Sequence, residues 1–121
     1  RFEEQKIPWQ AQVTIGGKLP CAEMMFCAIL SNVLENAMHA VQELPESRRR
    51  IGLSLSEKAG HLLLMVKNPV QTPPVFTDGI PVTERSGHGL GVRSIVYYVE
   101  KLHGQYQFRM EDGEFVVRLI F

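Results

Sequence analysis

Two asparagines, Asn32 and Asn36, stand four residues apart in the largely apolar run 30–41. At about 100° per residue, a helix places both on one stripe with Glu35 and His39, nearly opposite the apolar side chains. Asn is a poorer helix former than the Lys, Glu and Gln of an ordinary solvated face. Its amide carbonyl is also a hard oxygen ligand of the kind that suits Mg²⁺. The stripe is therefore a candidate binding surface, and a solvated helix face is the alternative.

A glycine-rich segment, 87–91 (Gly-His-Gly-Leu-Gly), is followed directly by a helical pattern over 92–103, with Gly104 as the expected C-terminal cap. A helix N-terminus presents backbone N–H groups and a dipole that favour an anion. The segment therefore predicts a phosphate-type site, and a flexible connector is the alternative. It lacks the Gly-Lys-Ser/Thr ending of a Walker A loop and the strand that precedes a dinucleotide fingerprint.

The composition predicts a single domain with its own core, since the chain has 121 residues and 45% of them are hydrophobic. A formal net charge of +0 and a pI near 7.1 argue against a nucleic-acid or membrane surface. No apolar run approaches the roughly 18 residues of a membrane span. Cys21 and Cys27 lack metal-ligand spacing; Cys27 is expected to be buried, and a reducing compartment suits both. Because the chain begins at Arg1, we expect it to be a piece of a longer protein.

Hydrophobic periodicity predicts the order strand, helix, two strands, long loop, helix, two strands. The predicted ranges are strand 10–15, helix 22–43, strands 51–56 and 61–66, loop 69–86, helix 92–103, and strands 105–110 and 114–121 around an Asp-Gly turn. A basic triplet, 48–50, is expected in a solvated loop. The loop 69–86 is proline-rich, and so long a connection is typical of a lid. These elements predict an α+β fold, a two-layer α/β sandwich with a mixed, mostly antiparallel sheet and the helices on one face.

The order of these features resembles the ATP-binding domain of the GHKL superfamily, a Bergerat-type fold. The superfamily includes gyrase, the ninety-class heat-shock chaperone, histidine kinases and MutL. The resemblance covers essentially the whole chain, 1–121, and is carried by Asn32, Asn36, Ala37, Gly87, Gly89, Leu90 and Gly91. It is nearest to the catalytic domain of sensor histidine kinases of the peptide quorum-sensing, accessory-gene-regulator type.

The resemblance implies that ATP and Mg²⁺ are bound and that Asn32, Asn36 and His39 form the catalytic group. Asn36 would coordinate Mg²⁺ through its carbonyl, and Asn32 would contact the phosphates or metal-bound water. His39 falls where such kinases often carry a basic residue near the phosphates, and a solvated helix residue is the alternative reading.

The nucleotide-binding set that the resemblance implies lies further along the chain. Glycines of the second glycine box would let the backbone approach the triphosphate, and Arg85 would reach the phosphates from the lid. Arg93, in the first turn of the second helix, is a weaker candidate. The full set is Asn68, Arg85, Gly87, His88, Gly89, Leu90 and Gly91.

Two departures from the family pattern have chemical consequences. Hydrolysing members carry a glutamate base one turn before the metal-binding Asn, where this chain has Asn32, while Glu35 lies off that position. Phosphoryl transfer to a protein side chain is therefore favoured over ATP hydrolysis. The first glycine box, usually Asp-x-Gly-x-Gly, is replaced by the run 66–70 (Val-Lys-Asn-Pro-Val). Asn68 keeps an acceptor oxygen for the adenine amine, and Pro69 stiffens the entry to the lid.

The sequence therefore predicts the cytoplasmic catalytic domain of a membrane-anchored bacterial sensor histidine kinase in two-component signalling. The accepting histidine is expected upstream of Arg1, on dimerisation helices of a homodimer, with a response regulator as partner and no nucleic acid. An anti-sigma-type serine kinase that binds a partner protein shares the fold and is one alternative. A degenerate GHKL interaction module, suggested by the altered first glycine box, is the other.

Overall fold

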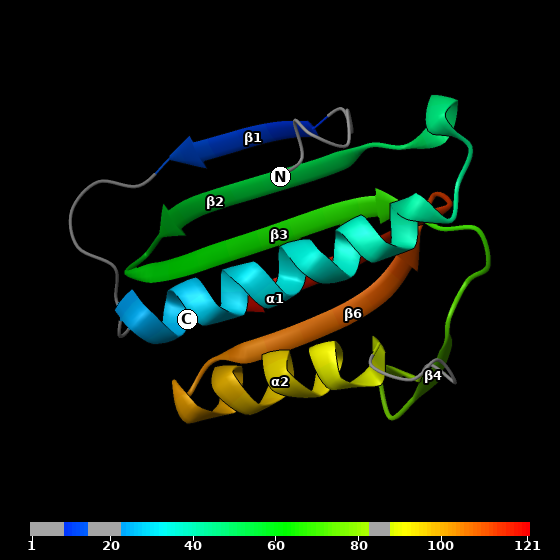
Figure 1. Ribbon diagram of the computed structural model, residues 1–121. Helices are drawn as coiled ribbons and strands as arrows, with labels where there is room; N and C mark the ends of the chain where they lie inside the picture. Colours follow the sequence, from blue (N-terminus) through cyan, green and yellow to red (C-terminus); the bar gives the residue numbers. More distant parts are fainter. Residues whose placement is uncertain (1–8, 15–22, 83–87) are drawn as a thin grey trace.

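The computed structural model describes residues 9–14, 23–82 and 88–121, with side chains over 24–81 and 92–121. Its elements follow the predicted order, with one 3-10 helix and one short hairpin added (Figure 1). They are β1 (Trp9–Thr14), α1 (Glu23–Gln42), the 3-10 helix η1 (Glu46–Arg48), β2 (Ile51–Lys58), β3 (His61–Pro69), β4 (Val75–Thr77), β5 (Ile80–Val82), α2 (His88–Lys101), β6 (Gln105–Glu111) and β7 (Glu114–Ile120).

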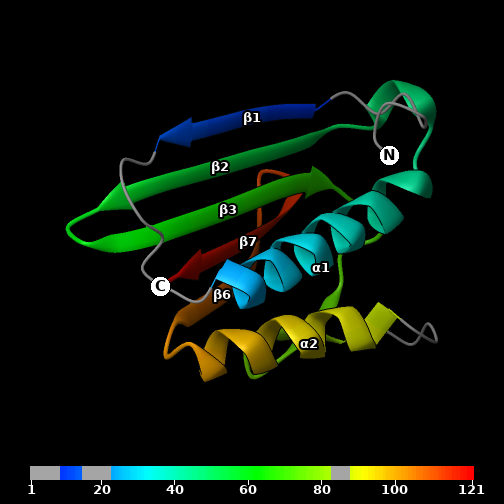
Figure 2. The same cartoon turned by 60° about the vertical axis from the view of Figure 1, so that its left-hand side comes forward.

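Five strands form one sheet in the order β1-β2-β3-β7-β6, in which β1 and β2 are parallel and the other neighbours are antiparallel. Both helices cover the same face of this sheet (Figures 1 and 2). Two-residue turns close the hairpins at Ala59-Gly60 and Asp112-Gly113, with φ between 53° and 82°. Positive φ at both turn positions matches the twist of the strands they join. The predicted α+β sandwich, mixed sheet and one-sided helix layer are confirmed.

The core lies between the helix layer and the sheet. Along β3, alternate residues Leu62, Leu64 and Val66 are buried against the helices, as period-two patterning requires. From α1, the fully buried Ile29 and Val41 belong to the same cluster. Contrary to the sequence expectation, the run 24–42 is long and apolar enough to cross a membrane by length and composition. In this fold its apolar stripe packs against β3 and α2 instead.

Helix α2 differs from its predicted range at both ends. It begins at His88, so that Gly89 and Gly91 lie in its first turn rather than in a preceding loop. At its C-terminus the N–H of His103 donates to the Glu100 carbonyl (3.0 Å), and that of Gly104 donates to the Val99 carbonyl (2.9 Å). These two bonds form a Schellman motif. His103, with φ 58°, takes the left-handed position that was predicted for Gly104.

The predicted loop 69–86 contains a hairpin that the sequence pattern did not show. Strands β4 and β5 pair antiparallel around Asp78 and Gly79, which have φ of 54° and 78°. Three-residue strands, one of them containing Pro81, are too short to display a period of two. The described part of this connection is therefore an ordered element and not a structureless lid.

Two residues differ from smaller expectations, although Arg48 and Arg50 of the basic triplet are exposed as predicted. Arg49, predicted in a solvated loop, donates from Nε to the Leu44 carbonyl (2.9 Å) and from Nη2 to the Gln42 carbonyl (3.2 Å). It thereby binds carbonyls at the end of α1 that no helical N–H satisfies. Cys27, predicted to be buried, is exposed, because the inward position of that turn belongs to Phe26.

Candidate functional site

Four elements meet at one end of the sandwich. Helix α1 and strand β3 run in the same direction, α2 runs in the opposite direction, and the β4–β5 hairpin lies beside the start of α2 (Figures 1 and 2). The second half of α1, the last residues of β3 and the first turn of α2 are consequently at the same end of the molecule. This arrangement brings Asn36, Asn68 and the backbone of the described glycine-rich residues 88–91 to one region, although they are far apart in the sequence.

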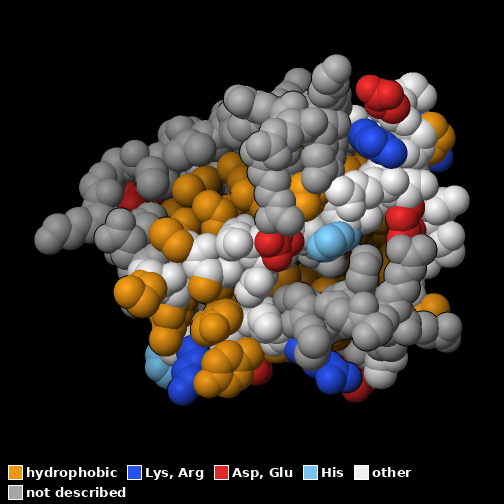
Figure 3. Space-filling view, viewed as in Figure 1, with side chains coloured by type: hydrophobic (Ala, Val, Ile, Leu, Met, Phe, Trp, Pro, Cys, Tyr) orange, Lys and Arg blue, Asp and Glu red, His pale blue; other side chains and the backbone are white. Residues whose placement is uncertain are grey.

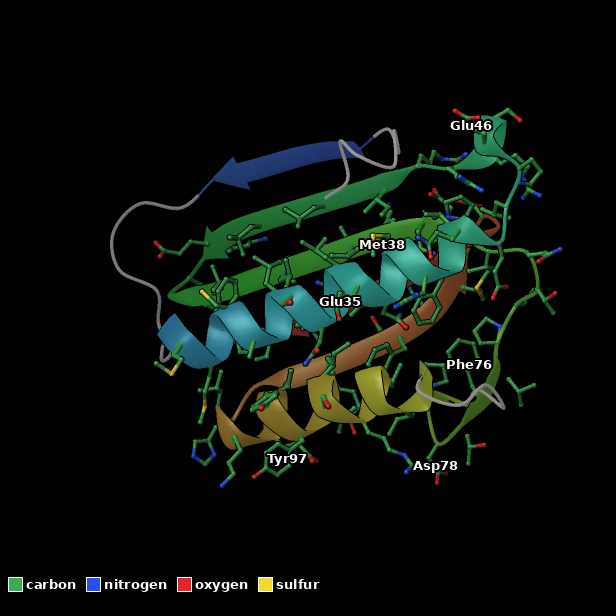
Figure 4. All side chains as sticks on the ribbon, viewed as in Figure 1. Glu35, Met38, Glu46, Phe76, Asp78 and Tyr97 are labelled. Carbon is green, nitrogen blue, oxygen red and sulfur yellow. The ribbon has the colours of Figure 1, made fainter. Side chains whose placement is uncertain are left out.

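The asparagine stripe of α1 lies at the edge of the core. Asn32, Glu35 and Asn36 are half-buried, whereas His39 is exposed. Figure 4 places Glu35 on the side of α1 that faces away from the sheet, opposite the buried Val33. In Figure 3 an acidic side chain and a histidine lie next to each other over α1. The structure therefore places the amides between core and surface, where they remain accessible to a ligand.

Asn68 is the one buried polar residue among the described side chains, and it is 1% exposed. It continues the inward alternation of β3, so its side chain faces the helix layer at the end of that strand. Its amide nitrogen donates to the carbonyl of Pro69 (3.0 Å). Because a buried amide is costly without hydrogen bonds, this bond stabilises its position. The side-chain oxygen is the acceptor atom that Asn68 can present.

An aromatic cluster that the sequence did not predict lies on the strands beside Asn68. Phe115 pairs with Asn68 across the β3–β7 register and is 5% exposed. Its ring stacks on Phe108 of β6, with centroids 6.2 Å apart, and on Phe76 of β4, at 6.4 Å. In the sequence, the one indication of this cluster is Phe76, the only aromatic residue between positions 69 and 86.

The glycine-box candidates are located only in part. Arg85 and Gly87 lie outside the described residues. The backbone of 88–91 (His-Gly-Leu-Gly) forms the first turn of α2, where free N–H groups gather. Arg93 is exposed on α2, as expected of a solvated position.

The side chains at this end fit a metal ion that is coordinated partly by the protein and partly by a bound ligand. Within the described residues, no group of three or more His, Cys, Asp or Glu side chains is placed to hold a metal ion. Magnesium commonly takes one or two protein oxygens and completes its shell with substrate phosphates and water. The half-buried amide of Asn36, at the same end as a helix N-terminus, matches that division of ligands.

Comparisons with known proteins agree with this architecture. A family model described as GHKL domain matches residues 22–121. A nucleotide-free catalytic domain of the histidine kinase ThkA superposes with a TM-score of 0.76 at 14% identity, covering 99% of this chain and 82% of that one. The mycobacterial sensor histidine kinase MprB gives 0.71 at 19% identity, covering 100% and 85%.

A third likeness, to full-length ShkA in complex with AMPPNP, gives a TM-score of 0.70 at 20% identity and covers 98% of this chain and 26% of that one. No curated protein matched in a sequence comparison. At identities this low, the superpositions show a shared fold, and the family model supplies the family.

Proposed function

This chain belongs to the GHKL family, and from that premise we propose that it is the Mg·ATP-binding catalytic domain of a sensor histidine kinase. The observation that carries the proposal is the meeting of the asparagine stripe, the buried Asn68 and the N-terminus of α2 at one end of the sandwich. The likeness to solved histidine kinase domains supports it.

The purine subsite of the proposal is Asn68. Its oxygen accepts a hydrogen bond from the exocyclic amine of adenine at the buried end of β3. Guanine presents a carbonyl at the same position, and two acceptors facing each other in a buried site are unfavourable. The subsite therefore prefers ATP to GTP.

The phosphate subsite joins α1 and α2. Asn36 offers its carbonyl to Mg²⁺, and Asn32, one turn earlier, contacts the phosphates or a metal-bound water. His39 lies on the same stripe as a donor to the phosphates. The N–H groups at the start of α2 face the anion, with Arg85 and the glycines of 87–91 as further contacts. When bound, Mg²⁺ would neutralise the negative charge that develops on the transferred phosphoryl group.

The chemistry proposed is transfer rather than hydrolysis. An amide such as that of Asn32 takes no proton from water, so the α1 stripe holds no general base at that position. The accepting group is a histidine on an upstream dimerisation segment of a membrane-anchored, cytoplasmically exposed homodimer, and the phosphoryl group passes on to a response regulator. A quorum-sensing role remains part of this proposal, on the sequence resemblance alone.

The alternatives are less well supported. The named structural neighbours are histidine kinases, which gives no support to an anti-sigma-type serine kinase. A degenerate interaction module is motivated by the missing first glycine box, and it predicts no nucleotide binding at all.

The test is a calorimetric titration of ATP with and without Mg²⁺. We expect Asn36→Ala to lose the metal-dependent part of the affinity and to keep the metal-independent part. Ser31→Ala is the matched control, because Ser31 is exposed on the same helix beside the stripe. An Asn36→Ala protein whose affinity responds to Mg²⁺ as the wild type does would remove Asn36 from the site.

A further inference from the structure

Phe76 connects the β4–β5 hairpin to the strands that carry the purine subsite. It is half-buried, and its ring lies nearly parallel to that of Phe115, at an interplanar angle of 23°. Phe115 is the cross-strand partner of Asn68 and stacks in turn on Phe108, at 15°. The three rings thus form a continuous stack from β4 through β7 to β6, and the amide of Asn68 lies on the strand next to its middle member.

The hairpin packs against the domain through its inward-facing side chains. Ile80 and Phe76 pack against the core, whereas the neighbouring Val75 is 71% exposed. Figure 4 shows Phe76 on the hairpin beside the start of α2. The hairpin therefore contacts the sheet through the ring of Phe76, which stacks on Phe115 of β7.

We infer that Phe76 is a positioning residue for purine recognition, acting through Phe115 on Asn68. This inference rests on the proposed function, since it assumes that Asn68 meets the adenine. Phe115 is held between two rings, and loss of one of them frees it to move next to the amide. The Phe76 ring also packs against the core to which Phe115 belongs, and a hydrogen bond to adenine is stronger where water is kept out. Binding of adenine at Asn68 therefore favours the packed position of the hairpin, and packing of the hairpin in turn strengthens adenine binding.

The test is a double-mutant cycle in ATP affinity with Phe76→Leu, Asn68→Ala and the double variant. Leucine keeps apolar volume and removes the ring. We expect Phe76→Leu to weaken ATP binding about fivefold, in line with the loss of an aromatic pair. GTP binding should change little, so that ATP-over-GTP preference falls. In the Asn68→Ala background the same change should have almost no further effect, because coupled residues are not additive.

Two controls separate positioning from folding. Val75→Ala changes the adjacent, outward side chain and should leave ATP affinity at the wild-type level. Phe76→Tyr restores a ring and should restore affinity. A measurement on the wild type alone needs no variant to fold: hydrogen exchange over 75–82 should slow with ATP and slow much less with GTP.

Each outcome decides the inference. Three results would overturn it. The first is wild-type ATP affinity in Phe76→Leu, and the second is independent losses of affinity from Phe76→Leu and Asn68→Ala. The third is equal protection of residues 75–82 from hydrogen exchange by ATP and GTP. If the wild type binds ATP in an Asn68-dependent way while Phe76→Leu is silent, the positioning role fails and the proposed function stands. If the wild type binds no nucleotide, both fail together.

Discussion

At the scale of a single residue, Asn68 is the side chain to which the proposed function assigns purine recognition. It is nearly inaccessible, its nitrogen is bonded to the carbonyl of Pro69, and it lies in register with Phe115. With the amide oriented in this way, its acceptor oxygen has a defined place at the end of β3. In the proposed function, this neutral amide provides the acceptor that an aspartate provides in the usual first glycine box, without burying a charge.

Replacing Asn68 by Ala should weaken ATP binding by about 1–3 kcal/mol, the usual loss when a buried hydrogen-bonding partner is removed. GTP should already bind poorly to the wild type. Competition between the two nucleotides measures both effects, and urea unfolding of the variant reports any loss of stability. Lys67→Ala, on the opposite face of the same strand, is the control. Equal affinity of the wild type for ATP and GTP would contradict the role of Asn68.

At the scale of elements, the junction of α2 with β6 shows why a glycine is needed where its φ does not require one. His103 takes the left-handed position, and Gly104 continues the Schellman motif. A Cβ on Gly104 would lie 2.6 Å from the carbonyl oxygen of Ile120 and 3.2 Å from a methyl of Val99. The glycine therefore permits the close approach of the helix end to the last strand.

We predict that Gly104→Ala destabilises the domain by about 1–3 kcal/mol, as expected when added volume meets well-packed backbone. Urea unfolding followed by circular dichroism measures the change. Gly52→Ala is the control, because a Cβ there meets nothing within 4 Å. Equal stability of the two variants would mean that the junction relaxes without cost.

At the scale of the whole molecule, the two-layer arrangement brings the parts of the proposed site together. The helices cover one sheet face, and α2 runs opposite to α1 and β3, so that the ends of α1 and β3 and the start of α2 lie at the same end of the molecule (Figure 1). A ligand bound at that end would contact several elements at once. It would stabilise only the folded state, in which these elements are together.

Mg·ATP should therefore raise the melting temperature of the wild-type domain. At a ligand concentration of about 100 Kd the expected stabilisation is roughly 2.7 kcal/mol. Differential scanning calorimetry measures it, with Mg²⁺ alone and ATP with chelator as controls. No shift at saturating Mg·ATP would favour the interaction-module reading over the kinase.

Much of the fold was predictable because its signals are local. The period of the α1 stripe, the alternation of β3 and the Asp112-Gly113 turn depend on near neighbours in the chain, and each matches the structure. The same local pattern put Asn32 and Asn36 on one stripe. What these asparagines bind stays a prediction.

Other features required the tertiary structure. The stack of Phe76, Phe115 and Phe108 joins three strands, and its geometry depends on packing between Phe76 and a strand that comes about 40 residues later in the chain. The β4–β5 hairpin has strands of three residues, which are too short to carry a period and are ordered by packing against the core. His103 takes the left-handed position, and the close approach of Gly104 to Ile120 involves the last strand, which a local pattern cannot show. The sequence by itself thus determined the main helices and the strands of the five-stranded sheet, together with the asparagine and glycine candidates of the site. Long-range packing decided which of them meet, because those contacts leave no periodic trace in the chain.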